Sequence, residues 1–345
     1  MDLNTRINLL SDLGKWILKD ENPRLELAKL KSTAENPWFT AENLDIALRA
    51  VAREFLDEKK LRQWVAQYPL EDQREDPKSI AVIAAGNIPL ACIHDLIAVF
   101  LSGHRAQLKL SSKDAFLLPA FIEYMSKKDS RVGEILQVVD KVNNPAAAIA
   151  TGSTNTSRYF ESYFKGIPSI IRKNRNSIAV LRGDEGESDF RALGEDIYRY
   201  FGLGCRSVSF LYVPEGYDFA PMMEFFREEY KSLLNHPKYQ NNYEYNLACA
   251  MLNRDKLIIG DNLLLFNRDN FLSRIATLHY RHYAEAEEII PVLESREEDV
   301  QCIATAVDLK SDHLKRLVVP PGTTQSPGLM DYADRVDTLD FLIKL

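Results

Sequence analysis

A single cysteine follows two glycines in the segment Phe201-Gly202-Leu203-Gly204-Cys205. Glycine can adopt positive φ and lets a ligand approach the backbone closely. A cysteine on such a loop is well placed to act as a nucleophile. Free cysteine is also a small hydrophobic residue that is often buried. Cys205 is therefore a candidate nucleophile, with core packing as the alternative.

Asn87 is a second candidate, in the segment Gly86-Asn87-Ile88-Pro89. It follows an apolar run at residues 79–85, which is typical of a buried parallel strand. Open α/β sheets bind ligands at the carboxyl ends of their strands, where a side-chain amide could donate to an oxyanion. Asparagine is equally common as a turn former before a proline-containing bend.

Two further strand ends carry residues suited to a nucleotide. Lys109 ends the apolar run 106–110, where its ammonium could reach a ribose or a phosphate, and a solvated strand end is the alternative. Gly152 and Ser153 follow the run 146–150 and begin a helix, whose free N–H groups can bind a pyrophosphate. Plain capping by the serine is compatible with that role. The chain lacks a G-x-G-x-x-G fingerprint, so an ordinary Rossmann dehydrogenase is not indicated.

The elements that must position these residues follow from the hydrophobic periodicity. Residues 1–70 read as helical, with Thr40 as a helix N-cap. From residue 79, short apolar runs alternate with helical patterns, which predicts a doubly wound parallel sheet with helices on both faces. A polar turn at residues 183–186 separates this region from a second alternation, in which we expect a helix over 187–201, a strand over 257–266 and a helix over 297–307.

We therefore expect an α/β protein with an N-terminal helical segment and two domains. The segment covers residues 1–70, a cofactor-binding domain covers 71–183, and a catalytic domain with Cys205 covers 184–319. The tail, residues 320–345, is expected to return to the first domain.

Composition narrows the class of protein. The 345 residues are 46% hydrophobic and 27% charged, as in a globular protein, and the net charge of -7 argues against nonspecific binding of nucleic acid. Four cysteines without a CxxC pair fit a reducing compartment. No apolar run is long enough for a membrane span, and the N-terminus lacks a signal-peptide pattern. We expect a cytoplasmic protein without membrane partners, and no metal site, because His279 and His282 would face opposite sides of a strand.

Read together, four motifs occur in a characteristic order: Gly-Asn-x-Pro, Leu-Lys-x-Ser, Thr-Gly-Ser and Gly-x-Gly-Cys. This order resembles the aldehyde dehydrogenase superfamily, and more narrowly the acyl-CoA reductases related to LuxC, the fatty-acid reductase of bacterial bioluminescence. The resemblance covers about residues 75–345 and implies two Rossmann-like domains. It implies that Cys205 takes the acyl group from a thioester, and that Asn87 and the Cys205 N–H form the oxyanion hole.

The same resemblance implies a nicotinamide cofactor held by Lys109, Ser111, Gly152 and Ser153. Glu287, in a Glu-x-x-x-Pro segment, resembles the glutamate that holds the nicotinamide ribose in this family, with a solvated glutamate as the alternative.

Cofactor preference depends on the residue after Ser111. NAD-preferring relatives often carry glutamate there, whose charge would repel a 2′-phosphate. Here Ser112 and Lys113 tolerate that phosphate, so we expect NADPH, with NADH as the alternative.

One departure from the family pattern bears on the reaction. Aldehyde-oxidising members carry Glu-Leu-Gly-Gly-Lys before a strand, and that glutamate activates water. The matching residues 172–177 contain no carboxylate. Losing a general base slows hydrolysis by roughly 10²–10⁴-fold, which favours thioester reduction over aldehyde oxidation. The cations Arg172, Lys173 and Arg175 are either contacts for coenzyme phosphates or exposed charges.

The resulting hypothesis is an NADPH-dependent reductase of a fatty acyl-CoA or acyl-protein thioester. An acyl-activating ligase and a second copy of the chain are the expected partners. An acyl-phosphate reductase, another oxidoreductase of the aldehyde dehydrogenase type, and a catalytically silent scaffold subunit are the alternatives.

Overall fold

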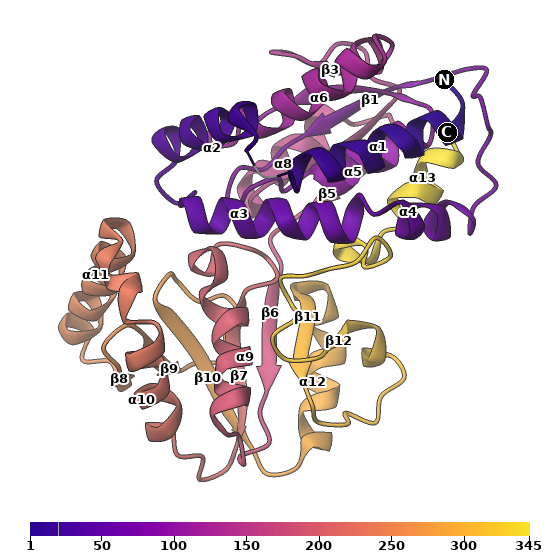
Figure 1. Ribbon diagram of the computed structural model, residues 1–345. Helices are drawn as coiled ribbons and strands as arrows, with labels where there is room; N and C mark the ends of the chain where they lie inside the picture. The colour runs from indigo at the N-terminus through magenta and orange to yellow at the C-terminus, as the bar shows by residue number, and fades with distance from the viewer. Residues whose placement is uncertain (20) are drawn as a thin grey trace. The chain divides into compact units, whose positions relative to one another are not determined.

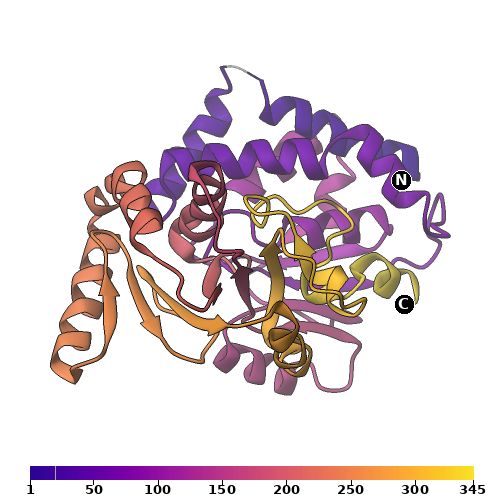
Figure 2. The same cartoon turned by 90° about the horizontal axis from the view of Figure 1, so that it is seen from below.

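The computed structural model describes residues 1–19 and 21–345, apart from the side chain of Thr154. The chain divides into two compact units (Figure 1): unit 1 is Met1–Asn174 with Pro327–Leu345, and unit 2 is Arg175–Ser326. Both chain ends lie in unit 1 (Figures 1 and 2). The division falls nine residues before the boundary expected after Gly183, because β6 (Asn176–Val180) pairs with β7 (Val208–Pro214) of unit 2.

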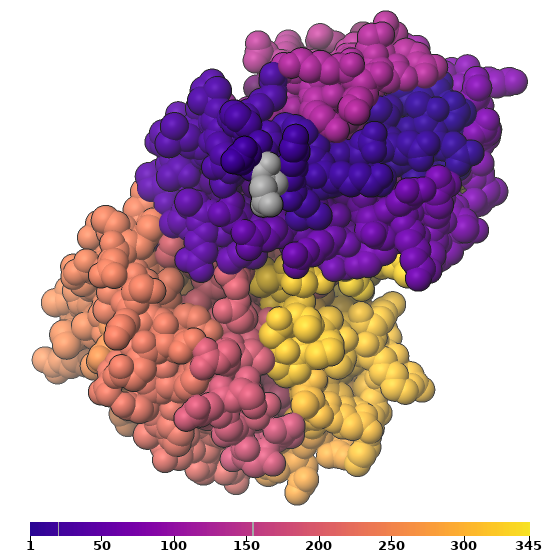
Figure 3. All heavy atoms as spheres, viewed as in Figure 1, coloured from indigo at the N-terminus to yellow at the C-terminus, as the bar shows by residue number. Residues whose placement is uncertain are grey.

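Helices fill the N-terminal part of unit 1, as the sequence predicts. They are α1 (Leu3–Ile17), α2 (Pro23–Glu35), α3 (Ala41–Ala50) with the π-helical turn η1 (Val51–Phe55), and α4 (Glu58–Val65). Thr40 caps α3, since its hydroxyl accepts a hydrogen bond from Asn43 N at 3.2 Å. On the face shown in Figure 3, these indigo residues form much of the surface of unit 1.

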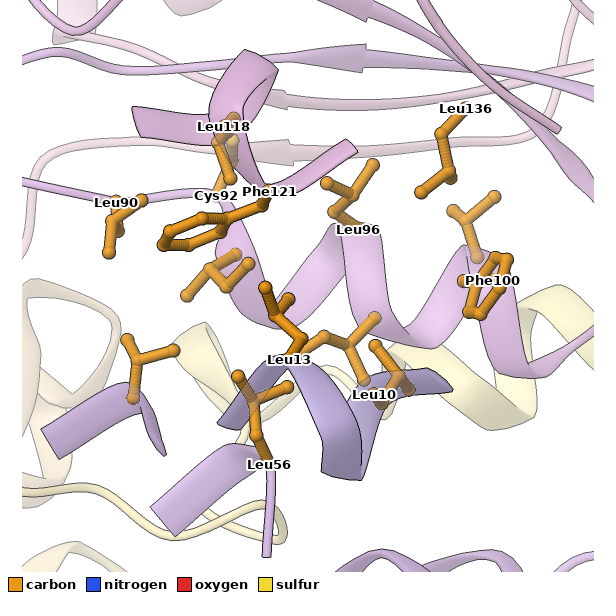
Figure 4. Packing of buried hydrophobic residues seen from close by; sticks show 14 of the residues in the cluster. Leu10, Leu13, Leu56, Leu90, Cys92, Leu96, Phe100, Leu118, Phe121 and Leu136 are labelled. Carbon is orange, nitrogen blue, oxygen red and sulfur yellow. The ribbon is translucent and has the colours of Figure 1, made fainter. Parts of the chain in front are cut away.

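These helices share one core with the rest of unit 1. Leu10 and Leu13 of α1 point toward α5 (Ile93–Leu101), and Cys92 lies beside Leu118 and Phe121 of α6 (Leu117–Lys128) in Figure 4. Burial of such apolar side chains contributes about 25 cal/mol for each Å² removed from water. The N-terminal segment is thus an integral part of unit 1.

Sheet A of unit 1 has five parallel strands in the order β3-β2-β1-β4-β5. The strands are β1 (Ser79–Ile83), β2 (Arg105–Lys109), β3 (Leu136–Val138), β4 (Ala147–Thr151) and β5 (Ser169–Arg172). The remaining helices are α7 (Val132–Ile135), α8 (Thr154–Tyr163) and α13 (Thr338–Ile343), the last of which is contributed by the C-terminal tail. The chain order reverses between β1 and β4, which makes this the topological switch point of the sheet.

Sheet B of unit 2 has seven strands in the order β12-β11-β6-β7-β10-β9-β8, parallel except for the edge strand β8. The strands beyond β7 are β8 (Leu257–Ile259), β9 (Leu264–Asn267), β10 (Thr277–Tyr283), β11 (Val300–Thr305) and β12 (Val318–Val319), and the helices are α9 (Glu187–Tyr198), α10 (Ala220–Glu229), α11 (Pro237–Asn253) and α12 (Ile290–Ser295). Figure 2 shows α9 and α12 on opposite sides of these strands.

Two predicted elements of unit 2 are wrong. Residues 297–307 contain the buried strand β11 and not a helix, whereas the apolar run 289–293 lies mostly in α12, where Pro291 occupies the first turn. Proline suits that position because its missing N–H has no partner there. Residues 257–266 form the β8–β9 hairpin and not one strand, because the chain turns at Gly260.

The predicted fold class is confirmed: two doubly wound α/β units follow an N-terminal helical segment. Among the described helices, none combines the length and the apolar character that a bilayer span requires.

Candidate active site

The carboxyl edge of sheet A gathers six of the predicted site residues. Ile83 at the end of β1 pairs with Lys109 of β2 and with Ala150 of β4. The segments that follow these strands therefore leave the sheet side by side. They carry Asn87, Lys109, Ser111, Ser112, Gly152 and Ser153. Asn87 lies beside the switch point, where open α/β sheets bind ligands.

Gly86 and Ser111 interlock the loops after β1 and β2. A Cβ atom on Gly86 would overlap the Ser111 hydroxyl, so only glycine fits there without a shift of its neighbour. The Ser111 oxygen also accepts a hydrogen bond from Lys113 N at 3.3 Å. Ser111 thus braces the turn that carries Asn87, in addition to the cofactor contact that the resemblance implies for it.

Gly152 and Ser153 form the entry to α8. Ser153 is the N-cap, and its hydroxyl accepts from Thr156 N at 3.3 Å. A Cβ on Gly152 would lie 3.0 Å from Thr156 Cβ and 3.1 Å from Phe160, so the backbone here is closely packed against its own helix. The N-terminus of this ten-residue helix suits the phosphates of a dinucleotide. Lys109 lies at the same edge of sheet A, on β2, which is separated from β4 by β1.

The loop before β7 presents Cys205. Helix α9 ends at Tyr198, and three successive residues then take positive φ: Tyr200 at 53°, Phe201 at 58° and Gly202 at 72°. The two aromatic side chains are buried, and the Phe201 ring lies 4.5 Å from that of His236. Positive φ is strained for bulky residues and persists only where packing enforces it.

Cys205 itself is exposed, so the core-packing alternative does not hold for it. Among the other cysteines, Cys92 and Cys302 are buried and Cys249 is half-buried. Burial raises the pKa of the Cys92 thiol well above its ordinary value, and the charge of Asp95 adds to that rise. Of the four thiols, Cys205 is the one that solvent reaches most freely.

Ser177 and Cys302 support the Cys205 loop from inside sheet B. The fully buried Ser177 hydroxyl donates to the Cys205 carbonyl at 3.0 Å and lies 3.1 Å from Cys302 Sγ. A hydroxyl has one proton, and the carbonyl can only accept, so the Cys302 thiol must donate to Ser177. Burial raises the pKa of Cys302 to about 11, which keeps that thiol protonated at neutral pH.

Asp196 fastens a second segment beside the same loop. Its buried carboxylate accepts hydrogen bonds from Gly322 N at 2.7 Å and from Thr324 N at 3.0 Å. The Thr324 carbonyl in turn accepts from Arg206, next to Cys205, at 3.5 Å. Burial raises the pKa of Asp196, although its hydrogen bonds to Thr324 and Gly322 oppose the rise. No sequence motif marked Asp196, Ser177 or Cys302.

Glu287 does not belong to this site. Cys205 precedes β7, whereas Glu287 follows β10, whose end at Tyr283 pairs with Pro214 at the far end of β7. The seven residues of β7 span about 20 Å at roughly 3.3 Å per residue. Glu287 is exposed and paired with Lys310 at 2.7 Å, and this hydrogen bond lowers its pKa. The role that the resemblance implies for Glu287, holding the nicotinamide ribose next to the reacting cysteine's site, is therefore unsupported, because Glu287 and Cys205 lie at opposite ends of the strands of sheet B.

Arg172 is neither an exposed charge nor a phosphate contact. Its guanidinium is buried and pairs with both oxygens of Asp95, with Nη2 at 2.7 Å from Oδ1. The same Nη2 donates to Thr338 of the C-terminal tail at 3.0 Å. Lys173 is exposed and pairs with Glu161 at 2.8 Å. Arg172 thus connects β5 of sheet A to the C-terminal tail. Among the described residues, no three His, Cys, Asp or Glu side chains lie close enough together to hold a metal ion.

No protein-family model matches the chain, and no curated protein matches it. Solved structures do. An oxidoreductase from Marinobacter aquaeolei is 16% identical over 95% of this chain and 79% of its own, with a TM-score of 0.68. Aldehyde dehydrogenase 21 from Physcomitrella patens, solved with the reaction product succinate, is 13% identical over 100% of this chain and 84% of its own, with a TM-score of 0.70.

An aldehyde dehydrogenase from Bacillus cereus, solved in complex with NAD+, is 14% identical over 88% of this chain and 72% of its own, with a TM-score of 0.64. At such low identity these likenesses establish the fold. The chain has the fold of the aldehyde dehydrogenases.

Proposed function

We propose that the protein reduces an acyl-CoA thioester to the aldehyde, with NADPH as reductant and Cys205 as the covalent acyl carrier. The observation that carries the proposal is the exposed Cys205 on a strained, internally braced loop, in an aldehyde dehydrogenase fold whose residues 172–177 offer no carboxylate. A thiol nucleophile can take the acyl group from a thioester by exchange, and this transfer needs no activated water.

In the first step, the Cys205 thiolate attacks the carbonyl carbon of the thioester. A new carbon–sulfur bond forms to Cys205, the bond to the coenzyme sulfur breaks, and the coenzyme leaves as its thiolate. Asn87 and the Cys205 N–H are the proposed donors to the oxyanion, each worth roughly 2.7–4 kcal/mol of barrier.

When bound, the nicotinamide would supply the hydride that reduces the acyl group. The bond between the acyl carbon and Cys205 Sγ then breaks, which releases the aldehyde and returns Cys205 as its thiolate. The residues that would hold this cofactor are at the carboxyl edge of sheet A: Lys109, Ser111, Ser112, Gly152 and Ser153. Ser112 and Lys113 are exposed, and neither would repel a 2′-phosphate. Their chemistry therefore supports NADPH over NADH.

Water must be kept from hydrolysing the acyl-enzyme. Arg172 stands in the segment where aldehyde-oxidising relatives carry their base, and its guanidinium is occupied by Asp95. Without a base, hydrolysis loses a factor of roughly 10²–10⁴. Slow hydrolysis of the acyl-enzyme favours its reduction to the aldehyde. The proposed source of the thioester is an acyl-activating ligase.

The test measures NADPH consumption and trapped aldehyde with acyl-CoA and with acyl phosphate as rival substrates. We expect turnover with acyl-CoA and none in Cys205→Ala. Faster turnover of acyl phosphate would identify an acyl-phosphate reductase. A folded protein that turns over neither substrate, with Cys205 inert to electrophiles, would identify a scaffold subunit.

A further inference from the structure

Asp114 is a buried carboxylate next to the turn that carries Asn87, and it takes no part in the proposed reaction steps. It is 4% exposed, and its Oδ2 accepts a hydrogen bond from Leu90 N at 2.7 Å. Within the described part of the chain, no group donates to its Oδ1. Burial raises the pKa of Asp114 to about 6, against the opposing effect of the Leu90 hydrogen bond. At neutral pH the carboxylate is thus largely ionised.

Leu90, the partner of Asp114, is held in a strained conformation. Its φ is 58°, a left-handed value that is rare for leucine, and its side chain is buried in the core of unit 1. Figure 4 shows Leu90 among these core side chains. Such strain persists only where the surroundings enforce it, and it concentrates at functional sites. The core fixes the side chain of Leu90, and Asp114 fixes its N–H.

The loop that carries Asp114 is itself held in place by hydrogen bonds and packing. Asp114 N donates to the Ser111 carbonyl at 3.1 Å, and Ser111 lies against Gly86. Asn36, at the end of α2, donates from its side chain to the Lys113 carbonyl at 3.3 Å. The loop over residues 111–114 is therefore a rigid support for the turn over residues 86–90.

We propose that Asp114 is a positioning residue: its carboxylate holds Leu90 in the left-handed conformation and so fixes Asn87, three residues earlier, for its hydrogen bond to the oxyanion. This inference rests on the proposed function. A buried carboxylate with one oxygen lacking a donor is unfavourable for folding. Hydrogen bonds to an ionised acceptor are stronger than neutral ones. A buried polar side chain that costs stability is thus retained at a place where its oxygen accepts the Leu90 N–H and holds the turn.

The test is the rate at which acyl-CoA acylates Cys205 without nicotinamide, followed by intact-protein mass. Asp114→Ala is expected to slow acylation by about 10²-fold, the usual effect of misplacing a catalytic group by about 1 Å. Asp114→Asn keeps an oxygen acceptor for Leu90 N and is expected to stay within about threefold of the wild type. The matched control is Asp129→Ala, which removes another carboxylate that accepts a backbone N–H, from Arg131 at 3.0 Å. It should leave the rate unchanged.

A double-mutant cycle separates positioning from general damage. If Asp114 acts through Asn87, the variant with both Asp114→Ala and Asn87→Ala acylates no more slowly than Asn87→Ala alone. If the two effects multiply, or if Asp114→Ala acylates at the wild-type rate, the positioning role is overturned. Should Asp114→Ala not fold, Asp114→Ser, whose shorter side chain does not reach Leu90 N, gives the same comparison. A wild-type protein that acyl-CoA does not acylate overturns the proposed function and this inference with it.

Discussion

The turn that carries Asn87 in unit 1 and the loop that carries Cys205 in unit 2 both have strained backbone conformations, and different kinds of side chain hold them in place. Each contains bulky residues at positive φ whose side chains are buried, Leu90 in the turn and Phe201 in the loop. Each is also held by one side chain from a neighbouring segment, Asp114 for the turn and Ser177 for the loop. The difference is charge. A carboxylate holds the turn, whereas a neutral hydroxyl backed by a thiol holds the loop.

This difference suits the two proposed tasks. A charge beneath the Cys205 loop would act on a thiolate nearby, since like charges within a few Å disfavour each other. Two hydrogen bonds link the Cys302 thiol to the Ser177 hydroxyl and that hydroxyl to the Cys205 carbonyl. All three groups are neutral while Cys302 keeps its proton. The Asn87 amide is neutral in all states, so a carboxylate can support its turn without changing its chemistry. Both regions are held in place, and the side chain that directly supports the Cys205 carbonyl is a neutral one.

Asn87→Ala removes the side chain that the turn is proposed to position, and it should change the acylation rate more than the other substitutions in this comparison. Removing one oxyanion donor should lower the acylation rate of Cys205 by roughly 10²–10³-fold. The measurement is the single-turnover rate with acyl-CoA. Asn253→Ala, an exposed asparagine at the end of α11, is the control and should react at the wild-type rate. A rate within about twofold of the wild type for Asn87→Ala would remove the turn from the mechanism.

Ser112→Glu tests whether the edge of sheet A that carries Asn87 also selects the cofactor. The new carboxylate should repel a 2′-phosphate and lower kcat/KM for NADPH by about tenfold relative to NADH, as expected for like charges near a surface. Steady-state kinetics with both cofactors measure the ratio. Ser130→Glu, at an exposed serine before α7, adds the same charge elsewhere and should leave the ratio unchanged. An unchanged ratio in Ser112→Glu would place cofactor selection outside this edge.

Ser177→Ala tests the neutral support of the Cys205 loop. Loss of the hydrogen bond to the Cys205 carbonyl should slow acylation by about tenfold, which corresponds to roughly 1.4 kcal/mol. Ser209→Ala is the matched control within the sheet, because Ser209 of β7 donates to the Phe271 carbonyl at 2.6 Å and to the Ser177 carbonyl at 3.4 Å, and not to the Cys205 carbonyl. If Ser209→Ala slows acylation as much as Ser177→Ala does, the effect belongs to the sheet and not to the loop.

Cys302→Ala refines that result and should have a smaller effect. It removes the donor to Ser177 and leaves the Ser177 bond to the Cys205 carbonyl in place. We expect a change of threefold or less, on the order of one weak hydrogen bond. If Cys302→Ala slows acylation more than Ser177→Ala does, Cys302 supports the Cys205 loop by a route other than its hydrogen bond to Ser177.

His104 offers the smallest effect and separates the stability of unit 1 from its chemistry. It is buried, its Nδ1 accepts from Lys78 N at 2.9 Å and its Nε2 donates to the Leu342 carbonyl at 2.9 Å. Burial lowers the pKa of His104 to about 4 from its ordinary 6.5. The folded state therefore resists protonation, and the stability contribution present above pH 6.5 is lost as the pH falls toward 4.

His104→Phe should flatten the dependence of the unfolding temperature on pH between 6.5 and 4. The difference between variant and wild type isolates His104, because Asp114, whose pKa is shifted the other way, is present in both. Parallel curves for the two proteins would show that His104 does not titrate as described. Acylation at pH 7.5 should be the same in both.

The sequence predicted the structural positions of most candidate residues, while their roles stay predictions. Asn87, Lys109, Gly152 and Cys205 were singled out because strand ends and glycine-rich loops have local signatures, and the four lie on such segments here. Their supports had no such signature. Ser177 and Asp196 look like any strand serine or helix aspartate. The pairing of β6 with β7 brings Ser177 to the Cys205 loop, and the hydrogen bonds of Asp196 to residues 322–324 appear only in the folded structure.

The errors have physical reasons as well. The run Val300–Thr305 is short and apolar, and such runs do not distinguish a strand from a buried helix. Glu287 matched a short motif, but a motif cannot tell which edge of a parallel sheet it will reach. Only the register of β10 against β7 does that, and it puts Glu287 at the edge away from Cys205.

The mass of the intact protein after mixing with acyl-CoA, in the absence of nicotinamide, decides whether Cys205 is the acyl carrier. We expect a gain equal to one acyl group in the wild type, located on the peptide with Cys205, and no gain in Cys205→Ala. A wild-type protein of unchanged mass, or an equal gain in Cys205→Ala, would show that Cys205 does not carry the acyl group.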